Sequence, residues 1–202
     1  MTMKIVKDIV IATHNPDKKK EIVIALNDLG VNILSLDNFP EIDEIEETGS
    51  TLLENSLIKA RTVFAKTGMP AIADDTGLEV DALNGAPGIY SARYAGINVS
   101  YEDNVRKLLS EMSSIEMESR TARFRTVISY HSLNTELWTD GVIEGSITKS
   151  PIGGKGFGYD PVFRVLKTGK TFAEMTKQEK NKISHRGVAL NKMCKLLKEN
   201  LK

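Results

Sequence analysis

A buried-strand pattern that runs straight into a helix start opens the chain and most constrains its fold. Residues 9–12 form a short, mostly β-branched run of the kind that is buried on both faces of a parallel sheet. In the polar turn that follows, Asn15 is a good N-cap and Pro16 suits the first helical position. We therefore predict a helix from Pro16 to about Leu29, ended by Gly30, and an α/β fold.

The alternation of strands and helices continues before the pattern changes. We predict a strand over residues 31–36, a helix from Thr51 to about Lys66 and a helix from Ser100 to about Met112. Residues 121–130 and 136–147 both have strand character, and the polar turn between them predicts an antiparallel hairpin. An amphipathic helix over residues 184–200 ends the chain. This order of elements predicts a mixed sheet in an α/β fold.

Length and charge narrow the class of function. The 202 residues suffice for a core without disulfides, and Cys194 is the only cysteine. The 27 basic and 27 acidic residues cancel, so no nucleic acid partner is expected and an anionic ligand must be met by a local cluster. The charged start, residues 1–8, is unlike a signal peptide, and no run is long enough to span a bilayer. We expect a cytoplasmic protein with no membrane partner.

Two adjacent carboxylates, Asp74 and Asp75, follow a small apolar run and precede Thr76 and Gly77. This order predicts a buried strand that ends at the acids and presents them at the rim of a cleft. Neighbouring buried carboxylates repel each other, so the fold must supply a cation, a proton or hydrogen-bond donors. Magnesium is the usual cation, because it takes one or two protein carboxylates and completes its shell with water and phosphate. The alternative is that both acids only cap a turn.

Two segments offer further ligands near a phosphate or a metal. The turn from Thr13 to Lys18 has the free amides and dipole of a helix N-terminus, which attract phosphate; the alternative is an ordinary cap with solvated lysines. The acidic pair Glu46 and Glu47 is either a solvated surface or a source of a second metal carboxylate. In the helix that follows, Asn55 and Lys59 are four residues apart and face the same way.

Two later segments suit a nucleotide base. In the glycine-rich loop over residues 153–160, the backbone can approach a ligand and Phe157 offers a stacking face, although a hairpin turn with a core Phe is the alternative. Lys180 can serve phosphate, and His185 with Arg186 offers several donors at a helix start. A histidine alone would more often be a surface cap, whereas the pair favours a ligand edge rich in carbonyl groups.

Taken in order, these motifs resemble the non-canonical purine nucleoside triphosphate pyrophosphatases, the inosine/xanthosine triphosphate pyrophosphatase family. The resemblance rests on residues 12–18, 46–59, 73–78, 85–94, 156–161 and 184–187, and it spans nearly the whole chain. It implies a two-lobed α/β fold with a long mixed β-sheet flanked by helices and a central active-site cleft. It also implies a single domain over residues 1–202, a homodimer, and magnesium-dependent hydrolysis of ITP, dITP and XTP to the monophosphate and pyrophosphate.

The resemblance also assigns roles to residues. Asp75 matches the proton acceptor and metal ligand, with Glu47 or its neighbour Glu46 as the second metal carboxylate. His14 stands where glycine is frequent in the family, and Thr76 stands where serine is frequent, but neither change removes chemistry. The positions matched to substrate binding are Thr13, His14, Asn15, Pro16, Asp17, Lys18, Lys59, Thr76, Phe157, Gly158, Tyr159, Asp160, Lys180, His185 and Arg186.

Two rival functions are kept. One is a pyrophosphatase for another nucleotide, such as a modified pyrimidine triphosphate, against which the pair His185 and Arg186 argues. The other is a sensor that binds purine triphosphates without cleaving them. A sensor would be expected to lack a metal carboxylate, whereas Asp75, Glu46 and Glu47 are all present.

Overall fold

The computed structural model describes residues 7–200, and two compact units divide them. The first unit holds the described residues up to Asp75, Val127–Asp140 and the residues from Ala189 onward, and the second holds Thr76–Thr126 and Gly141–Val188. Residues 1–6, which form most of the charged start, lie outside the described part, so the expected absence of a signal peptide stays a prediction. Four elements continue from one unit into the other: β3 (Ala71–Val80), β5 (Thr121–His131), β6 (Glu136–Ile147) and α5 (His185–Asn200).

The strands of the described residues form a mixed seven-stranded sheet. They are hydrogen-bonded in the order β2, β1, β3, β5, β6, β7, and β4 pairs with β3 off this path. Strand β1 is parallel to β2 and β3, whereas the pairs β3–β4 and β6–β7 are antiparallel. The predicted mixed sheet is therefore confirmed. The strands not yet bounded are β1 (Asp8–Ile11), β2 (Asn32–Ser35), β4 (Pro87–Gly88) and β7 (Phe163–Val165).

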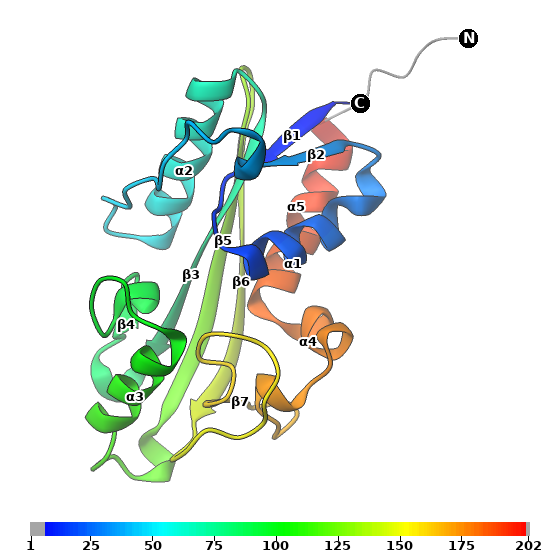
Figure 1. The fold of residues 1–202 in the computed structure, drawn as a ribbon. Coiled ribbons are helices and arrows are strands. Elements are labelled where there is room, and N and C mark those ends of the chain that lie inside the picture. Colours follow the sequence, from blue (N-terminus) through cyan, green and yellow to red (C-terminus); the bar gives the residue numbers. More distant parts are fainter. Residues whose placement is uncertain (1–6, 201–202) are drawn as a thin grey trace. The chain divides into compact units, whose positions relative to one another are not determined.

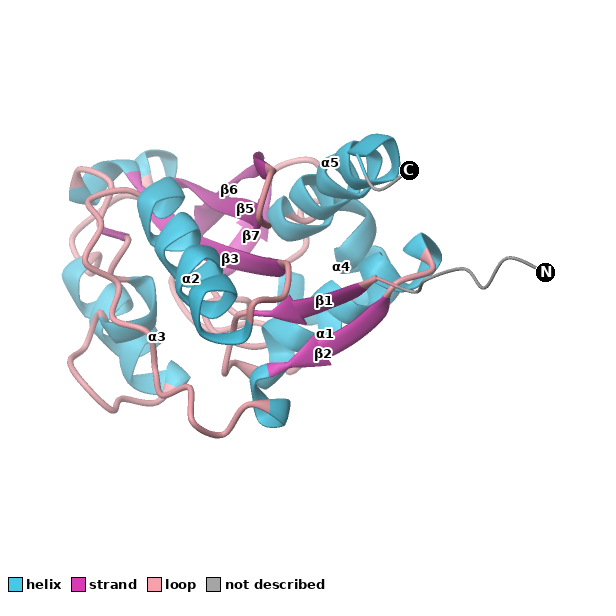
Figure 2. Cartoon of the chain, turned by 90° about the horizontal axis from the view of Figure 1, so that it is seen from above, coloured by secondary structure: helices cyan, strands magenta, loops and turns pink. Residues whose placement is uncertain are grey.

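In the first unit, β1 is buried on both faces, as its composition predicts. Ile9 and Ile11 share a core with helix α1 (Pro16–Leu26) and with α5. Val10 shares a separate core with helix α2 (Leu52–Thr67). Figures 1 and 2 show α1 and α5 against one face of β1 and α2 against the other. Successive side chains of a strand point to opposite faces, so the position of a residue along the strand decides which of the two cores, and which helix, it packs against.

Helix ends in the first unit follow the predicted caps. The Asn15 side chain accepts from the amides of Asp17 and Lys18, and the predicted helix continues past α1 as a short 3₁₀ segment up to Gly30, which is left-handed. Helix α2 begins after Thr51 and ends at a left-handed Gly68. Local sequence signals therefore place the starts of both helices, and these starts position the functional side chains described below.

In the second unit, helix α3 (Tyr101–Glu111) begins after Ser100, as predicted, and α4 (Lys177–Ile183) begins after Thr176; both caps form capping boxes. The core of this unit gathers residues of α3, the second half of β3, β5, β7 and the chain around Phe172. Arg120 is also buried here, and its guanidinium donates to four backbone carbonyl oxygens. These belong to Met112, Ile115, Ile147 and Thr148.

The prediction of a strand end at Asp75 is wrong. Strand β3 runs on through Thr76 and Gly77 to Val80, and a 3₁₀ segment follows it. Gly77 makes room for β4 rather than a turn, because a Cβ at this position would lie 2.7 Å from the carbonyl oxygen of Gly88. The two acids thus lie inside a buried strand, which removes the alternative that they only cap a turn.

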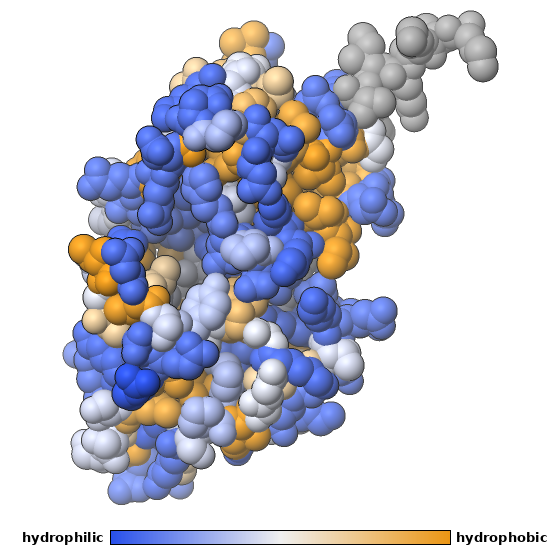
Figure 3. All heavy atoms as spheres, in the orientation of Figure 1, coloured by the Kyte–Doolittle hydropathy of each residue, from blue (hydrophilic) through white to orange (hydrophobic). Residues whose placement is uncertain are grey.

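The surface of the described residues carries mostly polar side chains on the face drawn in Figure 3. The most exposed large apolar side chains come from separate segments, including Ile97, Leu133 and Leu166. Over residues 7–200, none of the helices has the length and apolar character needed to cross a membrane.

Candidate functional site

The first unit brings together five of the charged residues that the sequence singles out. We call them the carboxylate–lysine cluster, and they are Lys18, Glu47, Lys59, Asp74 and Asp75. They come from α1, the segment before α2, α2 itself and β3. The cluster brings together one residue of the turn over residues 13–18, one of the acidic pair at 46 and 47, and both of the adjacent acids at 74 and 75.

Strand alternation separates the two adjacent acids. Along β3, Ile72 belongs to the core beneath α1, whereas Ala71 and Ala73 belong to the core beneath α2. The same alternation directs Asp74 toward α1 and Asp75 toward α2. The salt bridges agree: Asp74 Oδ2 lies 3.2 Å from the Nζ of Lys18 in α1, and Asp75 Oδ1 lies 3.3 Å from the Nζ of Lys59 in α2. Neighbours in sequence therefore have different partners.

Lys59 joins two carboxylates from different segments. Its Nζ lies 2.5 Å from Oε1 of Glu47 and 3.3 Å from Oδ1 of Asp75, and the side chain is buried. Burial alone would lower the pKa of Lys59, but the surrounding carboxylates, led by Asp75 and Glu47, outweigh it and raise that pKa. Lys59 is therefore a charged ammonium held between the two acids.

Asp75 is less fully compensated than Lys59. Burial raises the pKa of its carboxyl group and outweighs the opposing attraction of Lys59 and Lys18. Its Oδ2 is buried and has no hydrogen-bond partner among the described residues. A buried carboxylate oxygen without a donor is costly, so this position favours an added cation or a proton.

The donor set fits magnesium better than a metal that needs a full cage of side chains. Within residues 7–200, no group of three or more histidine, cysteine or acidic residues is arranged to hold a metal ion. Glu47 and Asp75 instead form a pair of carboxylates that share one lysine, and magnesium binds through one or two carboxylates with water and phosphate. Glu46 is exposed, and Glu47 is half-buried beside Lys59.

The segment that carries Glu47 is anchored to the first turn of α2. The amide of Gly49 donates to Oδ1 of Asn55, at 2.8 Å. Both the amide and the hydroxyl of Ser50 donate to Oε2 of Glu54, and these bonds lower the pKa of Glu54. Asn55, which the sequence places on the same helix face as Lys59, holds the loop through Oδ1, while its Nδ2 is buried without a hydrogen-bond partner among the described residues.

The turn over residues 13–18, before α1, has fewer free backbone amides than the sequence suggests. Oγ1 of Thr13 accepts from the amide of Asn15, and Oδ1 of Asn15 accepts from the amides of Asp17 and Lys18. The expectation of free amides at these two positions is therefore wrong, because the cap side chain already binds them. His14 and Pro16 are exposed, and the Asp17 side chain lies 3.5 Å from Lys20.

The second unit gathers the remaining predicted residues in what we call the aromatic–cation cluster: Thr76, Phe157, Asp160, Lys180, His185 and Arg186. The cluster contains a buried ion pair, in which Lys180 Nζ lies 2.6 Å from Asp160 Oδ2. Lys180 also lies over the Phe157 ring, 4.5 Å from its centroid. The loop and α4 are thus tied together through this lysine.

Arg186 and His185 have separate supports in this cluster. Arg186 Nη2 donates to Oγ1 of Thr76 at 3.1 Å, and the guanidinium lies 5.8 Å from the Phe157 ring centroid. The Thr76 hydroxyl also bonds to that of Thr126. His185 stacks on Phe124, with ring centroids 4.6 Å apart. Sequence reasoning missed Thr126 and Phe124, because a β-strand residue far along the chain carries no local signal of such a contact.

The glycine-rich loop is shaped by Asp160. Oδ2 of Asp160 accepts from the amide of Phe157 at 2.9 Å. Gly156 has a φ of 77°, and a Cβ there would lie 2.0 Å from the same oxygen, so only glycine fits. Tyr159, predicted as a nucleotide contact, lies in the core, and its hydroxyl donates to the carbonyl oxygen of Ser91.

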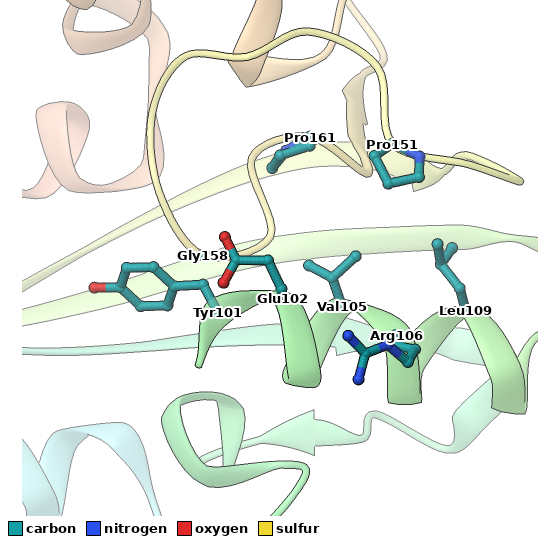
Figure 4. Close-up of a pocket in the computed structure, with 8 residues that line it drawn as sticks. All are labelled: Tyr101, Glu102, Val105, Arg106, Leu109, Pro151, Gly158 and Pro161. Atoms are coloured by element: carbon teal, nitrogen blue, oxygen red, sulfur yellow. The ribbon is translucent and has the colours of Figure 1, made fainter. Parts of the chain in front are cut away.

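A cavity of about 360 Å³ lies beside this loop, between it and α3 (Figure 4). Val105 and Leu109 project from α3 toward the loop that carries Pro151 and Pro161. Gly158 is the one predicted substrate-binding residue that lines the cavity. The members of the aromatic–cation cluster are not among the residues that line this cavity.

Comparisons with known proteins identify the family of this chain. The Ham1 family profile matches residues 9–196. A dITP/XTP pyrophosphatase of Bacillus subtilis (strain 168) is 48% identical over 196 residues, which cover 96% of this chain and 99% of that protein. A protein of the same name from Geobacter sulfurreducens is 49% identical over 194 residues, with 96% of each chain covered.

Solved structures give the same result. A HAM1 protein from Coxiella burnetii superposes with a TM-score of 0.88 at 42% identity, covering 96% of this chain and all of that one. The Ham1 protein of Staphylococcus aureus gives 0.87 at 40% identity, covering 97% of this chain and all of that one. Because the family profile and these relatives match nearly its whole length, the chain belongs to the Ham1 family.

Proposed function

We propose that this protein hydrolyses the non-canonical purine nucleoside triphosphates dITP, ITP and XTP to the nucleoside monophosphate and pyrophosphate. The observation that carries the proposal is the pair of carboxylates, Glu47 and Asp75, joined by the buried Lys59. Acids and a lysine in one cluster suit phosphoryl hydrolysis, which needs cations on the phosphate oxygens and a positioned water. The names of the relatives from Bacillus subtilis and Geobacter sulfurreducens support the same reaction.

Asp75 and Glu47 are the residues we expect to hold Mg²⁺, with exposed Glu46 as the less suitable neighbour. When bound, the ion would polarise the phosphate and make a bound water more acidic. Asp75 is also the expected proton acceptor, because its buried Oδ2 has no donor among the described residues.

Lysines supply the remaining positive charge. Three lysines each form a salt bridge with an acid in this structure: Lys18 and Lys59 in the carboxylate–lysine cluster, and Lys180 in the aromatic–cation cluster. We expect the triphosphate oxygens to compete for these ammonium groups, which would hold the leaving pyrophosphate. Thr13 and Asn15 would act mainly by shaping the turn before α1, since their side-chain oxygens accept from backbone amides.

Base selection follows from the donors of His185 and Arg186. Hypoxanthine and xanthine present a 6-oxo acceptor, whereas adenine presents an amino donor that would face donors. Arg186 is held by Thr76 and lies over the Phe157 ring, so its donors are already oriented. Guanine shares the 6-oxo group, and its rejection requires that its 2-amino group be left unpaired, at a cost of roughly 1–3 kcal/mol.

A sensor that binds without cleaving is the rival from another class. Its expected mark is a missing metal carboxylate, and both Glu47 and Asp75 are present with a shared lysine. A pyrophosphatase for modified pyrimidine triphosphates is less favoured, because His185 and Arg186 match the pair that reads a purine in the resembling family.

Assembly and location are further parts of the proposal. We expect a homodimer in the cytoplasm, with no nucleic acid or membrane partner, on the grounds of the resemblance and the balanced charge. Sedimentation equilibrium should then give about twice the chain mass of 22.3 kDa. A mass equal to one chain at micromolar concentration would contradict the dimer.

The experiment that tests the reaction separates its two products. Purified protein with Mg²⁺ is given ITP, XTP, ATP and GTP in separate reactions, and pyrophosphate and orthophosphate are assayed independently. We expect pyrophosphate from ITP and XTP, far faster than from ATP or GTP. Orthophosphate with a nucleoside diphosphate, or equal rates on ATP, would overturn the proposal.

A further inference from the structure

The Lys59 ammonium lies where a cation shared by Glu47 and Asp75 would be expected. Its Nζ is 2.5 Å from Glu47 Oε1 and 3.3 Å from Asp75 Oδ1. The side chain leaves α2 in its second turn and is 10% exposed, so water screens these contacts little. Any second cation that binds both carboxylates must therefore approach a buried ammonium at short range.

The other lysine of the cluster is not equivalent. Lys18 comes from α1 and lies 3.2 Å from Asp74, which points to the opposite face of β3. Lys18 is also more exposed, with 18% of its side chain accessible against 10% for Lys59. Lys59, in contrast, is in contact with both of the acids that we assign to the metal.

We propose that Lys59 is a place-holding counter-ion, which keeps Glu47 and Asp75 together and opposes Mg²⁺ until a triphosphate gives the ammonium a new anionic partner. This inference rests on the proposed function, because the triphosphate is the anion that takes over Lys59. Metal and nucleotide then bind cooperatively, and each raises the affinity for the other by the same factor. The apparent affinity for metal alone is low because the ammonium has to leave its acids first.

The proposal makes an unusual prediction for Lys59→Met. A residue that only supported the site would weaken metal binding when removed. A competing cation would strengthen it, because the repulsion between the ammonium and the metal disappears while Glu47 and Asp75 remain. We expect Mg²⁺ alone, without nucleotide, to bind Lys59→Met at least about tenfold more tightly than the wild type, which corresponds to about 1.4 kcal/mol.

The test is calorimetric titration of Mg²⁺ into protein stripped with EDTA. Wild type, Lys59→Met and one control variant are compared, with far-UV circular dichroism to verify folding. The control is Lys66→Met, which removes an exposed lysine from the same helix. It should keep the wild-type affinity within about threefold. Equal or weaker binding of Mg²⁺ by folded Lys59→Met overturns the proposal.

Lys59→Gln serves if the methionine variant does not fold, because its amide can still donate to one of the two acids while the charge is gone. In the wild type, an α,β-imido analogue of ITP, in which the bond that the enzyme would cleave is blocked, should raise the Mg²⁺ affinity. In Lys59→Gln, the ratio of the Mg²⁺ affinities with and without the analogue should fall toward one. An analogue that binds without changing the wild-type Mg²⁺ affinity also overturns the proposal. Failure of the proposed function is seen separately, as an absence of turnover of ITP and XTP by the wild type, because the titration of metal alone involves no nucleotide.

Discussion

Two consecutive residues of one strand have different roles because a β-strand turns successive side chains to opposite faces. Asp74 meets Lys18 of α1, and Asp75 meets Lys59 of α2. The repulsion expected between adjacent acids is thereby reduced, and each acid has a lysine of its own. This division supports Asp75 as the reactive acid and Asp74 as the residue that holds Lys18.

Asp75→Asn should remove turnover and leave nucleotide binding. The amide keeps the size of the side chain but cannot accept the proton of the attacking water, and loss of a general base typically costs about 10²–10⁴ in rate. Steady-state kinetics on ITP, with calorimetric binding of the imido analogue, measures both quantities. Asp74→Asn is the matched control and should lower kcat much less. An Asp75→Asn variant that retains wild-type kcat would assign the proton acceptor elsewhere.

Arg186→Ala should narrow the preference for ITP over ATP. Its guanidinium is oriented by Thr76 and Phe157, and a hydrogen bond from a charged donor is worth about 1.5–3 kcal/mol. The ratio of kcat/KM for ITP to that for ATP should therefore fall by about tenfold or more. Arg186→Lys, which keeps the charge but loses the planar fork, should fall between the two. If the ratio is unchanged in the alanine variant, Arg186 does not read the base.

At the level of elements, the first turn of α2 holds the loop that carries Glu47. Glu54 accepts two hydrogen bonds from Ser50, and Asn55 accepts one from Gly49. The sequence predicted a helix start at Thr51, where Glu54 binds Ser50 rather than closing a capping box onto Thr51. The first turn therefore positions the loop that carries Glu47 as well as starting the helix.

Glu54→Gln tests this anchor through its pH dependence. Hydrogen bonds from Ser50 lower the pKa of Glu54 in the folded protein. A lowered folded pKa contributes stability above the ordinary glutamate value of 4.5, and this stability is lost as the pH falls through the folded pKa. The variant should melt below the wild type at pH 7, and the difference in Tm should shrink as the pH falls below 4.5.

Thermal unfolding monitored by circular dichroism between neutral and acidic pH measures this difference. Glu118→Gln, at an exposed glutamate of the second unit, is the control and should match the wild type at every pH. A Tm difference for Glu54→Gln that stays constant across the pH range would show that the carboxylate charge is not what anchors the loop.

Elements with a strong local signal were predictable from the sequence, and contacts between distant segments were not. The helix starts at Pro16, after Thr51 and after Ser100 follow from capping residues, and each is confirmed. The strand end at Asp75 was wrong, because a Thr-Gly pair is a turn signal unless another strand packs closely against the glycine, as β4 does.

The site shows the same limit. Candidate residues stood out in the sequence, because adjacent acids after an apolar run and a His–Arg pair at a helix start are arrangements with a restricted chemistry. Their pairing could not, since Lys59 meets Glu47 and Asp75 only after α2 has packed against β1 and β3. The stacking of His185 on Phe124 could not be predicted either, because the sequence indicates only that an aromatic residue in a strand is buried, and not which side chain it contacts.

On the scale of the whole molecule, each compact unit contributes one part of the chemistry that we propose. The carboxylate–lysine cluster belongs to the first unit, and the aromatic–cation cluster to the second. Strand β3 carries Asp75 as a residue of the first unit and Thr76 as a residue of the second. The activity that we propose needs both clusters, so we expect it of the whole chain and of neither unit alone. The single domain over residues 1–202 stays a prediction.

The most direct measurement of the central claim is a competition in one reaction. dITP, XTP, dATP and dGTP are mixed at equal concentration with Mg²⁺ and the protein, and anion-exchange chromatography follows every nucleotide and pyrophosphate over time. Our account predicts that dITP and XTP are consumed first, each giving its monophosphate and one equivalent of pyrophosphate, while dATP and dGTP persist. Consumption of all four at similar rates, or accumulation of nucleoside diphosphates, would contradict it.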